Sequence, residues 1–257
     1  MQATDYSLGY SDAVLGFLSQ RTADTHAAFF LTHLQAGWRV LDAGCGPGTI
    51  TLGLARAVRP GRVTGVDLDD AQSAAAREEA EREGLKIDFR KASIYELPFE
   101  DESFDAVFSH AVLTHLSDPA AALIELRRVL KPGGLIGLRA GDLGGFLIDA
   151  SSGDAEQAMR AYIEWEKGSG KNPNIGRKLG RLLRQAGFDV QKHTASYEII
   201  ADGTLRAARR LAQVFMAQNP GADSDAGVDG SLFVALAWCE AIGIRVGTEI
   251  IQPETLG

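Results

Sequence analysis

The chain has 257 residues, and its 26 lysines and arginines against 34 aspartates and glutamates give a formal net charge of −8. This length suits one large α/β domain with or without an added lid, and a hydrophobic content of 45% allows a sizeable core, which excludes wholesale disorder. Apolar runs fall short of the ~20 residues that span a bilayer. Residues 1–10 also lack the basic and apolar segments of a signal peptide, so we expect a soluble, cytoplasmic protein without membrane insertion.

Residues 1–36 form the first predicted element, a helical cap in which apolar side chains recur every three or four residues. From residue 37 onward, short β-branched and apolar runs alternate with helical patterns. Predicted strands lie at 39–42, 62–67, 86–91, 104–109 and 135–139, and predicted helices at 49–58, 70–84 and 120–130. Asp70 and Gly84 are expected to cap the second of these helices. The alternation predicts a Rossmann-like, doubly wound α/β fold with a mainly parallel sheet and right-handed crossovers.

The pattern changes after residue 141. Helices are predicted at 154–167, 175–187, 202–218 and 230–242, with a strand at 189–200, whereas 244–251 fits either an edge strand or a tail. We therefore expect a core at 37–200 with a helical insertion near 142–175, and a C-terminal helical extension at 201–257. Helical additions at both ends would form a lid over the ligand edge of the sheet, enclosing a small substrate and excluding water.

A glycine-rich loop follows the first predicted strand, at 44–48. Ligands of open parallel sheets bind beyond the carboxyl ends of the strands, and glycines let the backbone turn sharply and approach a ligand closely. The helix after the loop presents unpaired N–H groups there. Asp67 ends the second strand 23 residues after Gly44, where its carboxylate can accept hydrogen bonds from a ribose diol. The loop and the acid together predict a nucleoside-bearing ligand.

Thr49 and Asp42 indicate which nucleoside ligand to expect. A dinucleotide fingerprint has a third glycine or alanine where this chain has Thr49. Asp42, two residues before the first glycine, would repel a pyrophosphate but attracts an ammonium or sulfonium cation. A zwitterionic, cationic ligand therefore fits the loop better than NAD does. No metal site is expected, because Cys45 and Cys239 lack the spacing of metal ligands.

Three segments carry a family resemblance: VLDAGCGPGT at 40–49, GVDLD at 65–69 and RVLKPGG at 128–134. Together they resemble class I S-adenosylmethionine-dependent methyltransferases, and within that family the small-molecule enzymes related to ubiquinone and menaquinone C-methyltransferases. The resemblance covers about residues 37–140 and continues more weakly through 176–188. It implies a seven-stranded type of sheet, S-adenosylmethionine as cofactor and S-adenosylhomocysteine as product.

The resemblance also implies roles for individual residues. The loop at 44–46 would hold the methionine portion, Asp67 the ribose hydroxyls, and Leu68 would pack on adenine. The family usually places an acidic residue after the third strand, where this chain has Ala92 and Ser93, and a serine is a weaker acceptor than a carboxylate. Ser109 and His110 fall where the family brackets the transferable methyl. The predicted cofactor-binding residues are Tyr10, Asp42, Gly44, Cys45, Gly46, Asp67, Leu68, Ala92, Ser93, Ser109 and His110.

Methyl transfer from an activated sulfonium depends mainly on alignment, so a general base is helpful but not obligatory. His110 and His115 are the candidate bases, because imidazole titrates near neutral pH; each is also compatible with a packing role. Candidate substrate-binding residues near the rim of the fifth strand and in the predicted lid are Arg139, Asp142, Phe146, Trp165 and Tyr197. Tyr162 is a further aromatic candidate.

The acceptor class stays open at this point. The position after the fourth strand reads Ser109-His110-Ala111-Val112, not the Asn/Asp-Pro-Pro-aromatic box of enzymes that methylate exocyclic amines. We favour a small molecule whose O, N or C atom is methylated by a monomer or homodimer. The basic helix at 175–187 keeps an RNA or protein methyltransferase as an alternative, although the acidic balance makes nucleic acid the weaker choice. A non-catalytic S-adenosylmethionine-binding module is the third possibility.

Overall fold

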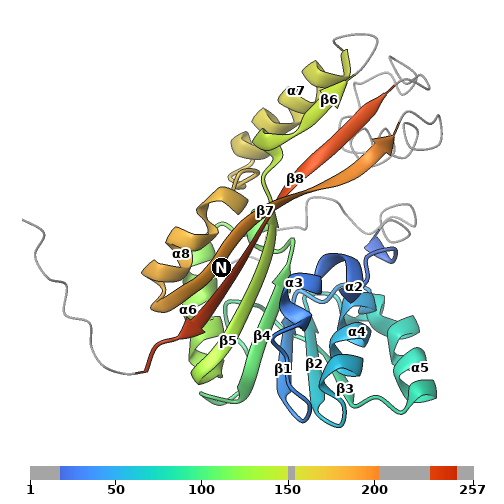
Figure 1. Ribbon diagram of the computed structural model, residues 1–257, viewed down its shortest axis with the longest axis vertical. Helices are drawn as coiled ribbons and strands as arrows, with labels where there is room; N and C mark the ends of the chain where they lie inside the picture. Colours follow the sequence, from blue (N-terminus) through green and yellow to red (C-terminus); the bar gives the residue numbers. More distant parts are fainter. Residues whose placement is uncertain (1–17, 150–153, 203–231, 248–257) are drawn as a thin grey trace, which may run out of the picture.

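The computed structural model describes residues 18–149, 154–202 and 232–247, which form one mixed sheet with helices on both faces (Figure 1). The strands follow the order β3-β2-β1-β4-β5-β8-β6, and β7 pairs with β8. All neighbours from β3 to β5 are parallel, whereas β8 is antiparallel to β5, β6 and β7. The strands are β1 Arg39–Ala43, β2 Arg62–Asp67, β3 Ile87–Lys91, β4 Phe104–His110, β5 Leu130–Gly141, β6 Leu147–Asp149, β7 Phe188–Asp202 and β8 Phe233–Arg245.

The strand order reverses between β1 and β4, which confirms the doubly wound fold and locates its ligand edge. The helices on the N-terminal side of the chain are α2 Ala23–His26, α3 Ala28–Leu31, α4 Thr49–Val58 and α5 Ala74–Glu83. Those that follow are α6 Pro119–Val129, α7 Asp154–Gly168 and α8 Leu179–Gln185. Single 3₁₀ turns lie at Asp70–Ser73, Leu113–His115, Leu143–Gly145 and Gly176–Lys178.

The central strands are apolar throughout because both of their faces are covered. Val40 belongs to the core cluster on the side of α2, α3 and α4, whereas its neighbour Leu41 belongs to the cluster on the side of α6 and α8. On β4, Phe108 likewise belongs to the cluster on the side of α2, α3 and α4, and Val107 to the cluster on the side of α6 and α8. Successive side chains of a strand point to opposite faces, so a strand buried on both faces reads as a continuous hydrophobic run.

Helix α3 is fixed on the sheet by one aromatic side chain. Phe30 is fully buried and lies against the ring of Phe108, with centroids 5.3 Å apart. A Cβ atom at Gly137 of β5 would come within 2.2 Å of the Phe30 ring, so only glycine allows this approach. Within the described residues, the segment predicted as a helical cap contains two short helices that lie over β4 and β5, while residues 1–17, including Tyr10, lie outside the described part of the chain.

Two predictions about helices were wrong. Residues 230–242 are not helical, because β8 spans Phe233–Arg245 and inserts beside β5. Nearly every residue of β8 is buried, and a run buried on both faces has no period that separates a strand from a helix. Asp70 does not begin the helix α5 either: Asp70–Ser73 is a 3₁₀ turn and Ser73 is the N-cap, although Gly84 is the C-cap as expected.

The other helices and strands after residue 141 agree better with the predictions from the sequence. The predicted helices at 154–167 and 175–187 appear as α7 and as a 3₁₀ turn followed by α8, and the predicted strand at 189–200 is β7. The predicted helix at 202–218 lies outside the described residues, and the domain boundaries stay a prediction. Figure 1 shows α7 and β6 at the upper end of the long strands β7 and β8, away from β1–β3. No helix in the described ranges is long and apolar enough to cross a membrane.

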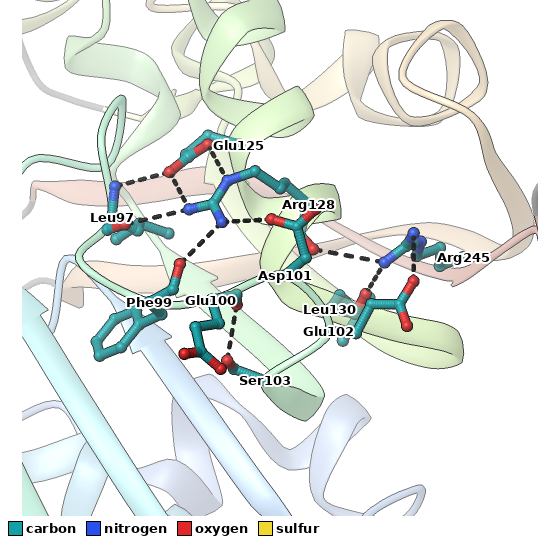
Figure 2. Close-up of polar contacts among 10 residues, drawn as sticks. All are labelled: Leu97, Phe99, Glu100, Asp101, Glu102, Ser103, Glu125, Arg128, Leu130 and Arg245. Atoms are coloured by element: carbon teal, nitrogen blue, oxygen red, sulfur yellow. Dashed lines mark hydrogen bonds and ion pairs between the residues drawn. The ribbon is translucent and has the colours of Figure 1, made fainter.

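Arg128 of the motif RVLKPGG has a structural role, shown in Figure 2. Its guanidinium donates to the carbonyl oxygens of Leu97 and Phe99, at 3.1 and 2.8 Å, and pairs with Asp101 and Glu125, both at 2.7 Å. The hydrogen bond from Arg128 lowers the pKa of Glu125. These contacts attach the segment between β3 and β4 to α6, and so fix one wall of the ligand edge.

Candidate active site

The loop after β1 turns through backbone conformations that favour glycine. Gly44, Gly46 and Gly48 have φ angles of 82°, 49° and 80°. The N–H of Gly44 donates to the carbonyl oxygen of Val66 at 2.8 Å, which ties the loop to the end of β2. A Cβ at Gly44 would lie 2.1 Å from a methyl carbon of Val112. A Cβ at Gly48 would likewise lie 2.7 Å from the Cβ of Ala76, so the glycines are required by conformation at three positions and by space as well at Gly44 and Gly48.

Asp67 sits beside this loop at the end of β2. Its Oδ2 accepts a hydrogen bond from the Gly46 N–H at 2.8 Å, and its Oδ1 accepts from the Asp69 N–H at 3.3 Å. Burial raises the pKa of Asp67, against the effect of these backbone N–H groups. Leu68, which follows, keeps 40% of its surface exposed and so offers an apolar face to a planar ligand.

Asp42 lies beneath the loop and is almost completely buried. Burial raises its pKa to about 7, against the hydrogen bond that the Thr51 hydroxyl donates to Asp42 Oδ2 at 2.7 Å. An acid in this environment is costly to ionise without a cation nearby. The position therefore suits a ligand with a positive charge.

A cavity of about 680 Å³ opens at the carboxyl ends of β1, β2, β3 and β4. Ten of the residues predicted from the sequence line it: Asp42, Gly44, Cys45, Gly46, Asp67, Leu68, Ala92, Ser93, His110 and His115. The structure thus brings together the cofactor candidates and both base candidates. Ser93 Oγ also accepts from the Tyr95 N–H at 3.2 Å, which shapes the turn after β3.

Other predicted residues lie elsewhere. Ser109 is buried, and its Oγ donates to the carbonyl oxygen of Ala43 at 2.8 Å, so it joins β4 to β1 and does not line the cavity. Asp142 forms a bidentate ion pair with Arg177, with contacts of 2.6 and 2.7 Å. The pair attaches the basic helix segment to the end of β5.

The aromatic substrate candidates are not brought to the cavity. Phe146 packs against the cluster of Met159, Ile163 and Leu236, and Tyr162 donates to Glu166 at 2.9 Å. Trp165 and Tyr197 are exposed by 43% and 54%. None of these side chains is among the described residues that line the cavity.

His110 is buried in the cavity wall, with 7% of its surface exposed. Its ring stacks on that of His26, with centroids 5.0 Å apart, and is T-shaped to that of Trp238, with centroids 5.1 Å apart. Among the described residues, neither ring nitrogen has a hydrogen-bond partner. Burial, followed by the positive charges of Arg21 and Arg139, holds the pKa of His110 well below its ordinary value, so the imidazole is neutral at neutral pH.

His115 is the second base candidate in the cavity wall. Burial lowers its pKa to about 4, and the charges of Lys171 and Arg21 act in the same direction. Both histidines are thus neutral at pH 7, and both can accept a proton there.

Sequence reasoning missed several lining residues, among them Leu18, Arg21, Tyr95 and Val112. Leu18 and Arg21 precede α2 and reach the cavity only because α2 and α3 fold back over β4 and β5. No local pattern indicates that packing. Val112 could have been found, since it follows the fourth strand at the same edge as His110.

The comparisons with known proteins agree with this geometry. The methyltransferase domain family matches residues 41–138. An uncharacterized methyltransferase of Schizosaccharomyces pombe is 35% identical over 248 residues, which cover 90% of this chain and 89% of that protein. The chain belongs to the class I S-adenosylmethionine-dependent methyltransferases. Its cofactor is S-adenosylmethionine, and the resemblance inferred from the glycine loop is confirmed.

More distant methyltransferases match shorter parts. A sterol 24-C-methyltransferase of Gibberella zeae is 30% identical over 203 residues, 72% of this chain and 51% of that protein. A ubiquinone biosynthesis O-methyltransferase of Hahella chejuensis is 41% identical over 98 residues, 38% of this chain and 40% of that protein. The solved geranyl diphosphate C-methyltransferase of Streptomyces coelicolor shares the fold, with a TM-score of 0.56 and 21% identity over 86% of this chain and 78% of that one.

Proposed function

We propose that this methyltransferase transfers the methyl group of S-adenosylmethionine to a small molecule held in the cavity at the ends of β1 and β4. One observation carries the proposal: the cavity of about 680 Å³ is lined both by the cofactor motif and by the histidines of β4 and the turn after it. A volume in this range fits enclosed small ligands. Cofactor and acceptor would therefore meet in one enclosed space.

The cofactor-binding roles follow from the contacts of each residue. Asp67 would accept hydrogen bonds from the ribose hydroxyls in place of part of its present contact with Gly46. The loop at 44–46 would hold the methionine portion, with Asp42 as the acidic partner of its cationic groups, and Leu68 would pack on adenine. Ala92 and Ser93 would border adenine, with serine as the weaker acceptor.

The protein's contribution to the reaction is alignment and exclusion of water. When bound, S-adenosylmethionine supplies a methyl group on a sulfonium that is already activated. Alignment of two reactants in a closed site can supply ~7–11 kcal/mol, whereas a general base adds ~10²–10⁴-fold in rate. Leu18 and Arg21, just before α2, close one side of the cavity, and His110 and His115 are the groups that can accept a proton.

Two observations support a small acceptor over a nucleic acid. The sterol, ubiquinone-pathway and geranyl diphosphate enzymes named above carry small molecules in their names. The basic helix α8 is packed on the body of the fold through Leu179 and Leu183, and Arg177 just before it is neutralised by Asp142. The positive charge of Arg177 thus has a structural use.

The test is calorimetry with S-adenosylhomocysteine on the wild type and on Asp67→Ala. We expect binding by the wild type and at least tenfold weaker binding by the variant, because a charged hydrogen bond is worth ~1.5–3 kcal/mol. Asp88→Ala is the matched control, since Asp88 pairs with Arg90 on β3 and does not line the cavity. Absence of wild-type binding, or equal binding by both variants, contradicts the proposal. The expected cytoplasmic location and the state as monomer or homodimer are checked by fractionation and by light scattering.

A further inference from the structure

His110, which lines the cavity, begins a row of polar side chains that crosses neighbouring strands. His110 of β4 is in register with Arg139 of β5, and Arg139 is in register with Glu240 of β8. Residues in register point to the same face of a sheet. Arg139 Nε donates to Glu240 Oε1 at 3.3 Å, and the Arg139 guanidinium lies 4.3 Å from the centre of the Trp238 ring. We call His110, Arg139, Trp238 and Glu240 the β4–β8 polar ladder.

The polar ladder carries hydrogen-bonding atoms that the described part of the protein does not satisfy. These are both ring nitrogens of His110 and Nε1 of Trp238, whereas Nη1 of Arg139 lies 3.9 Å from Glu198 Oε2 in an ion pair. The side chains of His110 and Trp238 are both more than nine-tenths buried. Buried polar groups of native proteins are nearly always hydrogen-bonded, so the two unpaired ring nitrogens of His110 in the cavity wall indicate a bound partner.

The unpaired donor and acceptor atoms restrict the chemical class of the bound partner. Trp238 Nε1 can only donate, while a neutral imidazole has one nitrogen that accepts and one that donates. A hydroxyl complements the imidazole, because it can donate to the accepting nitrogen of His110 and can also accept from an N–H. A protonated amine has no acceptor and would lie next to the positive charge of Arg21, which also lines the cavity. A carboxylate has no proton to donate to the accepting nitrogen of His110.

Resting on the proposed function, we infer that the methyl acceptor is a neutral alcohol or phenol whose hydroxyl is hydrogen-bonded by His110. The acceptor oxygen attacks the methyl carbon, the bond between that carbon and sulfur breaks with its electron pair on sulfur, and the hydroxyl proton passes to the free nitrogen of His110. The imidazolium then releases the proton to water. The products are a methyl ether, S-adenosylhomocysteine and a proton.

A weakly basic imidazole is adequate for this step. As the oxygen–carbon bond forms, the hydroxyl becomes an oxonium group, which is a far stronger acid than an imidazolium. Neutral His110 therefore needs only to lie within hydrogen-bond reach of the oxygen. Arg21, Arg139 and His26 face it, with Glu198 behind His26 at 3.6 Å, and these contacts keep the lone pair available at neutral pH.

The rings around His110 are positioning residues. His26 stacks on one side of the imidazole and Trp238 is T-shaped to it, so the ring cannot turn away from the cavity without losing both contacts. Trp238→Phe keeps an aromatic ring beside His110 but removes the Nε1–H donor together with part of the buried indole.

The experiment follows the labelled methyl group. The enzyme is incubated with S-adenosylmethionine labelled with ¹³C in the methyl, together with the small-molecule fraction of the source cells and matched probes, 2-naphthol and 2-naphthylamine. Carbon–proton correlation spectra identify the atom that carries the label. We expect label on oxygen, with a rate about 10²–10⁴-fold lower in His110→Gln, unchanged in His33→Gln at an exposed histidine, and about threefold to tenfold lower in Trp238→Phe.

The outcomes are distinguishable. Label on nitrogen or carbon, or full activity of His110→Gln, overturns the inference and leaves the proposed function standing. No labelled product from any mixture refutes the proposed function, and the inference with it. Circular dichroism spectra that match the wild type show that each variant is folded, so that a lost rate is not the result of unfolding.

Discussion

Asp42→Asn tests the electrostatics of the cofactor loop through stability. The wild-type carboxyl has a pKa of about 7 in the folded protein against an ordinary value of 3.8, because it is buried. Between these values the folded state holds a proton that the unfolded state has lost, so the stability falls as the pH rises through this window. The linkage relation gives a loss of about 2.5 kcal/mol between pH 5 and pH 8. Asparagine does not titrate and carries no such loss.

The measurement compares urea unfolding of the wild type and Asp42→Asn from pH 5 to pH 8, followed by tryptophan fluorescence. We expect the difference in unfolding free energy to shift by about 2.5 kcal/mol in favour of the variant as the pH rises. Asparagine keeps an oxygen that can accept the Thr51 hydroxyl, and its added amide lowers the stability by a similar amount at every pH. The shift with pH is therefore the diagnostic quantity.

Asp105→Asn is the matched control with the opposite sign. Burial raises the pKa of Asp105, but the hydrogen bonds from the Arg39 N–H at 2.8 Å and from Lys131 at 2.5 Å outweigh it and leave the pKa lowered. Its carboxylate stabilises the folded state above pH 3.8, and this contribution is lost only as the pH falls through the lowered value. No shift is expected between pH 5 and pH 8. A pH-independent difference for Asp42→Asn, or the same shift in both variants, refutes the reasoning.

Asp42→Asn should also weaken the binding of S-adenosylmethionine. The ammonium and sulfonium groups of S-adenosylmethionine favour the ionised form of Asp42, so wild-type affinity is expected to fall as the pH drops below about 7. Asp42→Asn should bind the cofactor about 10–100-fold more weakly than the wild type at pH 8, because it loses one charged hydrogen bond. Its affinity should not change with pH in this range. An acid that lowers stability but strengthens binding is the pattern expected at a functional site.

Three further predictions concern the fold around the cavity. Gly44→Ala should abolish S-adenosylhomocysteine binding in calorimetry, because its Cβ would meet Val112 at 2.1 Å and its φ of 82° is strained for alanine; wild-type affinity would contradict this. Phe30→Ala should lower the unfolding free energy by about 3–5 kcal/mol in urea titrations, as a fully buried ring is lost from the face of β4 and β5. Arg128→Met should destabilise the fold by about 1–3 kcal/mol, since the carbonyl oxygens of Leu97 and Phe99 lose their donors, and a loss near zero would argue against this role.

The cofactor half of the fold could be predicted closely from the sequence. Helix α4 and strand β2 begin and end at the predicted residues, because glycines, proline and apolar runs mark their ends locally. The loop at 44–48 and Asp67 belong to consecutive β-α units, so their meeting is dictated by the right-handed crossover between β1 and β2. Local signals and near-neighbour topology were enough for this half of the site.

The acceptor half could not be predicted, for a physical reason. Aromatic residues such as Phe146 and Tyr162 were chosen by residue type, but they pack in a cluster with α7 and the ends of β7 and β8. Trp238 was assigned to a helix, because a strand buried on both faces has no amphipathic period. Because residues 230–242 were predicted as a helix, the contact between Trp238 and His110 could not be foreseen.

The order of the strands explains why the specificity residues are dispersed in sequence. Strand β8 comes last in the chain yet pairs with β5, so Glu240 lies beside Arg139 after an interval of about a hundred residues. In the proposed site the ends of the parallel strands β1–β4 would bind the cofactor, and the antiparallel pairing of β8 adds Trp238 and Glu240 to the face that His110 shares. Changes in β7 and β8 can therefore alter the acceptor without disturbing the glycine loop. This separation predicts that acceptor class follows the residue in register with Arg139 more closely than it follows the cofactor motif.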